Sequence, residues 1–174
     1  MSQPSEDRPN PNVLAIDPTP FYFEDYTSDW KIEGGAYQVT EAEILEFGRR
    51  FDPQPFHADA EAAAQSPFGG LIAPGCLTFS IRQALHNQLP VRPALIAGLG
   101  ADALDLPTPV RPNDTLHLKI EVVEARRSRS RPDRGIVATR QSVLNQNDEV
   151  VLTMIAKMIV RARTTPSEDE ATDA

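Results

Sequence analysis

Asp52 and His57 are the residues whose types and spacing first indicate chemistry. They stand five positions apart in Asp52-Pro-Gln-Pro-Phe-His57, where two prolines favour extended backbone and predict a segment that is not helical. Because proton transfer depends above all on geometry, such a stiff segment can hold a carboxylate and an imidazole around one water molecule. The same residues also fit a plain turn, in which Asp52 accepts hydrogen bonds from backbone N–H groups and His57 lies on the surface.

Gly75 is a second candidate, because it begins the most helix-like stretch of the chain, which ends near Gln88. Leu77, Ile81 and Leu85 recur there every four residues, which predicts a helix largely covered by other structure. The first N–H groups of a helix lack partners within it, and that end of the helix dipole is positive. A thioester carbonyl placed at this point would gain hydrogen bonds as negative charge grows on it. A glycine needed only for a tight turn explains the residue equally well.

Two shorter helices are expected before this stretch. Thr40 and Glu43 are spaced as in a capping box, with Thr40 capping the helix and Glu43 reaching back. The apolar spacing that follows predicts a helix over about residues 41–51 with one buried face. Asp59 can cap a short helix over about residues 60–65.

The remaining body has the period-two alternation that is typical of strands. An extended segment is expected within residues 21–39, and four strands are expected at about 94–104, 115–126, 135–145 and 150–162. The expected order along the chain is one strand, short helices, one long helix and then four strands. This order is typical of an α+β fold. We expect an antiparallel sheet with the helices on one face.

Three segments of the sequence extend these observations. The first is Phe51-Asp-Pro-Gln-Pro-Phe-His-Ala-Asp59, and the second is Ala62-Ala-Ala-Gln-Ser-Pro-Phe-Gly-Gly-Leu-Ile-Ala-Pro-Gly75. The third lies downstream and is Leu106-Pro-Thr-Pro-Val-Arg-Pro-Asn-Asp-Thr-Leu116. These segments resemble the MaoC-like dehydratases, the group that includes the R-specific enoyl-CoA hydratases. The resemblance covers about residues 21–162.

The resemblance implies a hot-dog fold, in which an antiparallel β-sheet wraps around a long central α-helix. This agrees with the order of elements above. It also implies a homodimer, or a larger assembly of dimers, whose sheets join edge to edge with the active sites near the interface. Such pairing protects exposed edge strands from aggregation.

By the same resemblance, Asp52 and His57 match the catalytic pair of the family, and Gly75 matches the glycine whose N–H polarises the thioester carbonyl. The implied reaction is the reversible syn addition of water to a trans-2-enoyl thioester, which gives the (R)-3-hydroxyacyl product. One residue of the pair would take a proton from water while the other supplies a proton to the α-carbon. Neutral His57 is the expected base, because a neutral imidazole can accept a proton from water. CoA or phosphopantetheine enters only as part of the substrate, so no separate cofactor is expected.

Pro74 and Ser80 are further candidates for contact with the acyl group. Many family members have His where this chain has Pro74, and a proline has no N–H to donate, so the acyl or CoA preference can differ. Ser80 follows Gly75 by five residues, although a helix serine bonded to a preceding carbonyl is the commoner arrangement. Cys76 is expected to be a small buried residue.

Three other sets of polar residues give weaker indications of function. Five arginines between residues 126 and 134 either bind the phosphates of the substrate or belong to a solvated hairpin loop. Asp52, His57 and Asp59 lack a standard ligand spacing, so no metal is expected. His86 is expected to be structural or exposed.

Composition limits the partners and the location. The 174 residues carry a net charge of −8 without a dominant basic field, which argues against nucleic acid. No apolar stretch approaches the length of a membrane span. The single cysteine excludes an intramolecular disulfide and fits the cytoplasm. We expect a flexible arm over residues 1–20, one domain over 21–163 and a disordered acidic tail over 164–174.

Two other functions compete with hydration. A hot-dog thioesterase normally needs a carboxylate on or beside the central helix, and residues 75–88 contain no Asp or Glu. A non-catalytic acyl-thioester-binding protein is the other alternative. The presence of both Asp52 and His57 argues modestly against it.

Overall fold

The alternating segments of the second half of the chain form one antiparallel sheet. The structure is a computed structural model that describes residues 19–163. Its five-stranded sheet has the order β2-β5-β6-β7-β4, and β1 and β3 form a separate parallel pair. The strands are β1 (Thr19–Phe21), β2 (Lys31–Gln38), β3 (Val91–Pro93), β4 (Leu95–Asp105), β5 (Thr115–Arg127), β6 (Arg134–Leu144) and β7 (Val150–Arg161).

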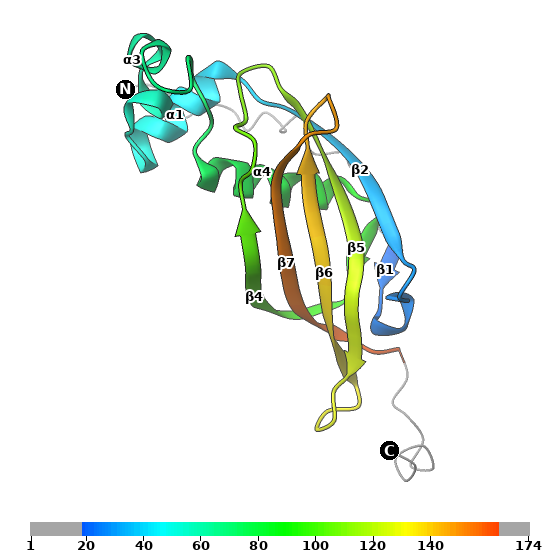
Figure 1. Cartoon of the computed structure of the whole chain (residues 1–174). Helices are drawn as coiled ribbons and strands as arrows, with labels where there is room; N and C mark the ends of the chain where they lie inside the picture. The colour runs from blue at the N-terminus through cyan, green and yellow to red at the C-terminus, as the bar shows by residue number, and fades with distance from the viewer. Residues whose placement is uncertain (1–18, 164–174) are drawn as a thin grey trace, which may run out of the picture.

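The α-helices lie on one face and at one end of this sheet. They are α1 (Glu41–Phe51), α2 (Pro55–Ala58), α3 (Ala60–Ala64) and α4 (Gly75–Gln88). A short 3₁₀ helix, η1 (Phe23–Asp25), lies at the opposite end, beside the β5–β6 hairpin. Figure 1 shows α4 crossing one face of the curved sheet, with α1 and α3 together at one end. The hot-dog architecture expected from the sequence is confirmed. The helices of the described residues include none that is long and apolar enough to cross a membrane.

The expected arm and tail lie almost entirely outside the described residues. Only Thr19 and Pro20 of the expected arm are described, and both belong to β1. The parallel pairing of β1 with β3 was not expected from the sequence. Each of these strands has three residues, which is too short for periodicity to reveal.

The expected capping of α1 is half right. Thr40 Oγ1 accepts a hydrogen bond from the Glu43 backbone N–H at 3.2 Å, so Thr40 caps the helix. The Glu43 carboxylate does not close the box by reaching back. It accepts a hydrogen bond from the Tyr37 hydroxyl, which links α1 to the end of β2.

The expectation that residues 52–57 are not helical is wrong for their second half. Pro55 is the first residue of α2, and His57 lies inside this short helix. A proline is well tolerated at the first position of a helix, because its missing N–H would have no partner there and its φ already suits a helix. The prolines therefore start a helical turn instead of preventing one.

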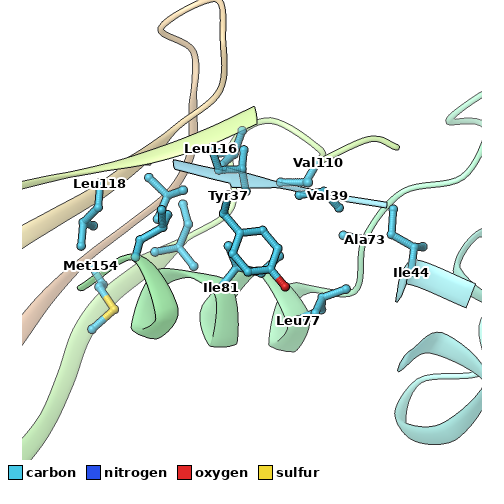
Figure 2. Packing of buried hydrophobic residues seen from close by; sticks show 14 of the residues in the cluster. Tyr37, Val39, Ile44, Ala73, Leu77, Ile81, Val110, Leu116, Leu118 and Met154 are labelled. Carbon is cyan, nitrogen blue, oxygen red and sulfur yellow. The ribbon is translucent and has the colours of Figure 1, made fainter. Parts of the chain in front are cut away.

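The core between α4 and the sheet fixes the rotation of the helix. Leu77 and Ile81 of α4 pack in one cluster with Leu116 and Leu118 of β5, and all four side chains are almost completely buried. Figure 2 shows these side chains between the helix and the sheet. Full burial of such a side chain contributes about 2 kcal/mol. This face therefore stays against the sheet, and Gly75 begins the helix at a defined place.

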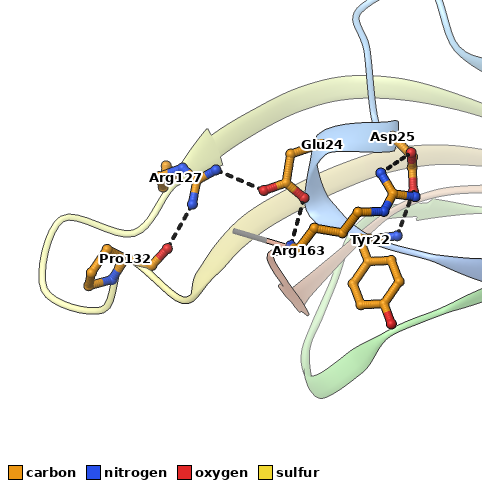
Figure 3. Close-up of polar contacts among 6 residues, drawn as sticks. All are labelled: Tyr22, Glu24, Asp25, Arg127, Pro132 and Arg163. Atoms are coloured by element: carbon orange, nitrogen blue, oxygen red, sulfur yellow. Dashed lines mark hydrogen bonds and ion pairs between the residues drawn. The ribbon is translucent and has the colours of Figure 1, made fainter. Parts of the chain in front are cut away.

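At the end of the sheet away from α1, charged side chains connect neighbouring elements through hydrogen bonds and ion pairs. Arg163 donates two hydrogen bonds to the Asp25 carboxylate, at 2.8 and 2.6 Å, and its backbone N–H bonds Glu24. Arg127 donates to Glu24 and to the carbonyl oxygen of Pro132. Figure 3 shows how these contacts join η1 to the β5–β6 hairpin and to the end of β7.

Candidate active site

Asp52 is placed by the end of α1. It is the residue that ends the helix, and its backbone N–H bonds the Gly48 carbonyl at 2.9 Å. The side chain is 37% exposed, and its Oδ2 lies 3.6 Å from His57 Nε2. The two residues that the sequence selected therefore face each other.

His57 is buried and held in one orientation. Its Nδ1 lies 2.7 Å from the Ile72 carbonyl oxygen, and the Ile72 N–H in turn bonds the Phe56 carbonyl oxygen at 3.1 Å. A carbonyl oxygen only accepts, so Nδ1 carries the hydrogen in this bond. In the neutral ring, Nε2 is then the acceptor that faces Asp52.

Gly48 holds the backbone of His57 close to α1, a role that the sequence analysis missed. A Cβ atom at Gly48 would lie 2.3 Å from the carbonyl oxygen of His57. Any side chain there would push the His57 segment away from the helix. The one available signal was a glycine inside a predicted helix, which is costly unless packing requires it.

His57 and Gly75 line a common cavity of about 350 Å³. Most of the remaining wall is apolar, and Thr78 adds a hydroxyl. Asp52 is not part of this wall and reaches the site through its contact with His57 Nε2. An apolar cavity with a few polar groups is typical of a small-molecule site.

Gly75 is the first residue of α4, as expected. The preceding Pro74 offers no side-chain cap, and its carbonyl accepts from the Thr78 N–H at 3.1 Å and from the Thr78 hydroxyl at 3.4 Å. The Gly75 N–H therefore belongs to the first turn, whose amides have no partner within the helix. A Cβ atom at Gly75 would lie 2.6 Å from Leu106 Cδ1, so the glycine also leaves room beside the cavity.

The other candidates lie apart from the cavity. The Ser80 hydroxyl donates to the Cys76 carbonyl at 2.9 Å, which is the structural alternative considered for this serine. Both Ser80 and Cys76 are exposed, so the expectation of a buried Cys76 is wrong. Asp59 accepts two backbone N–H bonds at the start of α3 and does not join the pair. Thr78, which the sequence analysis did not select, is the buried polar residue of α4 in the cavity wall.

The arginines of residues 126–134 lie at the other end of the sheet from α1 (Figure 1). Arg127 is engaged with Glu24, Arg134 with Asp133, and Arg126 with Glu124. These contacts support the interpretation of a charged hairpin loop rather than a phosphate site.

Known proteins resemble this chain in sequence and in fold. The family model described as MaoC like domain matches residues 30–145. A crystal structure of a MaoC-like dehydratase from Rhodospirillum rubrum is similar with a TM-score of 0.74 and 38% identity, covering 83% of this chain and 99% of the other. The R-hydratase PhaJ1 from Pseudomonas aeruginosa, in the unliganded form, has a TM-score of 0.62 and 26% identity, with 84% and 92% covered. A UPF0336 protein of Streptomyces griseus is 32% identical over 135 residues, which are 73% of this chain and 87% of that protein.

Proposed function

Because this chain belongs to the MaoC-like domain family, we propose that it is a hydratase/dehydratase that adds water reversibly to a trans-2-enoyl thioester and forms the (R)-3-hydroxyacyl thioester. One observation carries the proposal. Asp52 Oδ2 and His57 Nε2 face each other at 3.6 Å beside a cavity that also reaches the first residue of α4.

The distance between these two atoms suits a shared water molecule. At 3.6 Å the atoms are too far apart for a direct hydrogen bond. With Nδ1 donating to Ile72, both His57 Nε2 and the Asp52 carboxylate are acceptors. The two O–H groups of one water molecule can donate to both, which aims the lone pairs of its oxygen away from the pair.

The addition then balances within this pair. His57 Nε2 takes a proton from the water as its oxygen bonds to the β-carbon, and the electrons of the double bond move toward the carbonyl. The imidazolium next to the Asp52 carboxylate returns this proton to the α-carbon, which restores the starting state of the site. Oxygen and proton arrive from the same side, because both come from one place, and this accounts for syn addition. His57 thus serves as base and then as acid. This differs from the expectation that the two steps are divided between the two residues, because an ionised Asp52 has no proton to supply.

The carbonyl oxygen is assigned to the first turn of α4. Negative charge grows on this oxygen as water adds, and the Gly75 N–H and the positive end of the helix dipole stabilise it there. CoA or phosphopantetheine enters as part of the substrate, with no separate cofactor. We also assign the enzyme to the cytoplasm, on the strength of its single cysteine.

The edge strand β4 supports a homodimer. It lies at the edge of the sheet, and its Leu95, Leu99 and Leu104 side chains are half exposed. An exposed apolar edge of this length favours pairing with another strand. We propose that β4 pairs with β4 of a second copy. Sedimentation of the purified chain is expected to give a dimer, and Leu99→Asp is expected to give a monomer. A wild-type monomer would contradict this.

The function is tested by incubating the purified protein with enoyl-CoA thioesters of increasing chain length. We expect loss of absorbance at the band of the conjugated thioester without release of thiol. Release of thiol would instead indicate a thioesterase, and binding without turnover would indicate a non-catalytic protein. Either result would overturn the proposal.

A further inference from the structure

A second cavity, of about 390 Å³, lies farther along the same helix. Gly75, Phe79, Arg82 and His86 follow one another at spacings of four, three and four residues, so they share one face of α4. Gly75 lines the cavity of the active site, and the other three line the second cavity. From Gly75 to Arg82 the helix rises by about 10 Å.

Strands β7 and β4 line the two cavities in the same order along the molecule as α4 does. In β7, Val151 lines the active-site cavity, and Met154 and Met158 line the second. In and after β4, Leu106 lines the first cavity and Ala101 the second. The two cavities therefore follow each other along α4, β4 and β7. A chain attached to a carbonyl at Gly75 points toward the second cavity if it follows the helix.

Arg82 is a buried cation without a counterion in the described part of the chain. Only 6% of the residue is exposed. Its Nη1 donates to the Gln141 side-chain oxygen at 3.0 Å, and its guanidinium lies over the Phe79 ring. Its Nε is buried without a hydrogen-bond partner, and no carboxylate of residues 19–163 forms an ion pair with it. A buried charge left in this state is costly, and an anion would remove the cost.

The wall of the second cavity is cationic, although the chain has a net charge of −8. It contains Arg82, Arg92 and Lys157, and no Asp or Glu. Lys157 already pairs with Asp102. Arg92 donates to an asparagine oxygen and is exposed, so water can reach its other donors. Arg82 is therefore the buried cation with donors to spare. His86 Nδ1 beside it is also buried without a partner. Burial, together with Arg82 and Arg92, lowers the pKa of His86 to about 4, so the neutral ring can place a hydrogen on Nδ1 and donate it.

We propose that the second cavity receives the far end of the acyl chain and that Arg82 binds a carboxylate carried there. The substrates would then be enoyl thioesters whose acyl group ends in a second acid. This inference rests on the proposed function and adds the substrate class to it. Arg82 would act as a specificity residue, with the Gln141 side chain holding its guanidinium in place.

The test uses pairs of N-acetylcysteamine thioesters, which contain no phosphate, with acyl chains of equal length that end in methyl or in carboxylate. Saturated pairs are titrated by calorimetry, which requires no turnover, and enoyl pairs give kcat/KM. At the chain length that reaches Arg82, wild-type protein is expected to prefer the carboxylate. Arg82→Met is expected to reduce this preference by roughly 10- to 100-fold through Kd and KM, as for the loss of a hydrogen bond to a charged group. Arg126→Met removes an equal charge from the exposed hairpin and is expected to keep the preference.

Equal binding of methyl- and carboxylate-ended thioesters by the wild-type protein would overturn the inference, and would fit an Arg82 that is neutralised by a second copy of the chain. An unchanged preference in Arg82→Met would also overturn it. An equal loss of binding of both CoA thioesters in Arg82→Met, with no difference between methyl and carboxylate, would mean that the CoA phosphates are the anion recognised and would also overturn the inference. Calorimetric preference without hydration of any enoyl thioester would contradict the proposed function and leave the assignment of Arg82 supported.

Discussion

Replacing Gly48 with alanine tests whether the position of His57 controls the rate. The new Cβ atom would lie 2.3 Å from the His57 carbonyl oxygen and 2.8 Å from its carbonyl carbon. Real Cβ atoms essentially never come closer than 3.0 Å to such atoms, so the His57 backbone must move by about 0.7 Å. Displacements of about 1 Å at a catalytic group cost roughly 100-fold in rate. We expect Gly48→Ala to lose about 100-fold in kcat/KM, which is about 2.7 kcal/mol of transition-state stabilisation.

The same substitution is expected to have a smaller effect on stability. Overpacking costs about 1–3 kcal/mol, while alanine is favoured over glycine inside a helix by about 1 kcal/mol. The variant should therefore fold, with a net loss of about 0–2 kcal/mol in the free energy of unfolding measured in urea. Glu46→Ala, at an exposed position of the same helix, is the matched control and should keep the wild-type rate.

Hydration is followed by the loss of the enoyl-thioester absorbance at several substrate concentrations. We expect the loss mainly in kcat, because the His57 ring contacts the reacting water molecule and makes little contact with the acyl chain. A folded Gly48→Ala protein with the wild-type kcat would refute the reasoning, since the close contact would then place no catalytic group.

Two further predictions concern stability. The pKa of His86 is lowered to about 4 by burial and by Arg82 and Arg92, whereas the unfolded chain binds this proton near pH 6.5. The free energy of unfolding should thus fall as the pH drops from 6.5 toward 4, by at most about 3 kcal/mol. Urea unfolding at several pH values should show a smaller decline in His86→Gln than in the wild type. Equal declines in the two proteins would contradict the lowered pKa of His86. A Cβ atom at Gly135 would lie 2.0 Å from the Phe23 ring. In the same assay, Gly135→Ala should therefore lower the free energy of unfolding by about 1–3 kcal/mol. A Gly135→Ala protein as stable as the wild type would mean that the Phe23 ring moves away freely.

Apolar periodicity was sufficient for the main elements of the fold. The spacing of Leu77, Ile81 and Leu85 gave α4 its correct bounds, because these side chains do form its buried face. The strands were located by alternation, which reflects a sheet with one face against the helix. The β1–β3 pair was missed because three-residue strands carry no period.

The site was only partly predictable. Asp52, His57 and Gly75 were identified from a motif, and the structure brings the first two together and places the last in the wall of the His57 cavity. The close approach of Gly48 to His57 depends on how α1 and α2 pack, which no local pattern encodes. The burial of Arg82 was hidden for a similar reason, since an arginine on a helix is usually exposed and only the fold shows that it faces a cavity.

The central claim is that Asp52 and His57 act as one unit on one water molecule. It is tested most directly by kcat/KM for enoyl-thioester hydration in the wild type, Asp52→Asn, His57→Gln and the double variant. We predict that each single variant folds and loses about 100- to 10,000-fold, and that the double variant is no slower than the slower single variant, because residues of one unit are not additive. Losses that multiply in the double variant, or a single variant at the wild-type rate, would contradict the claim.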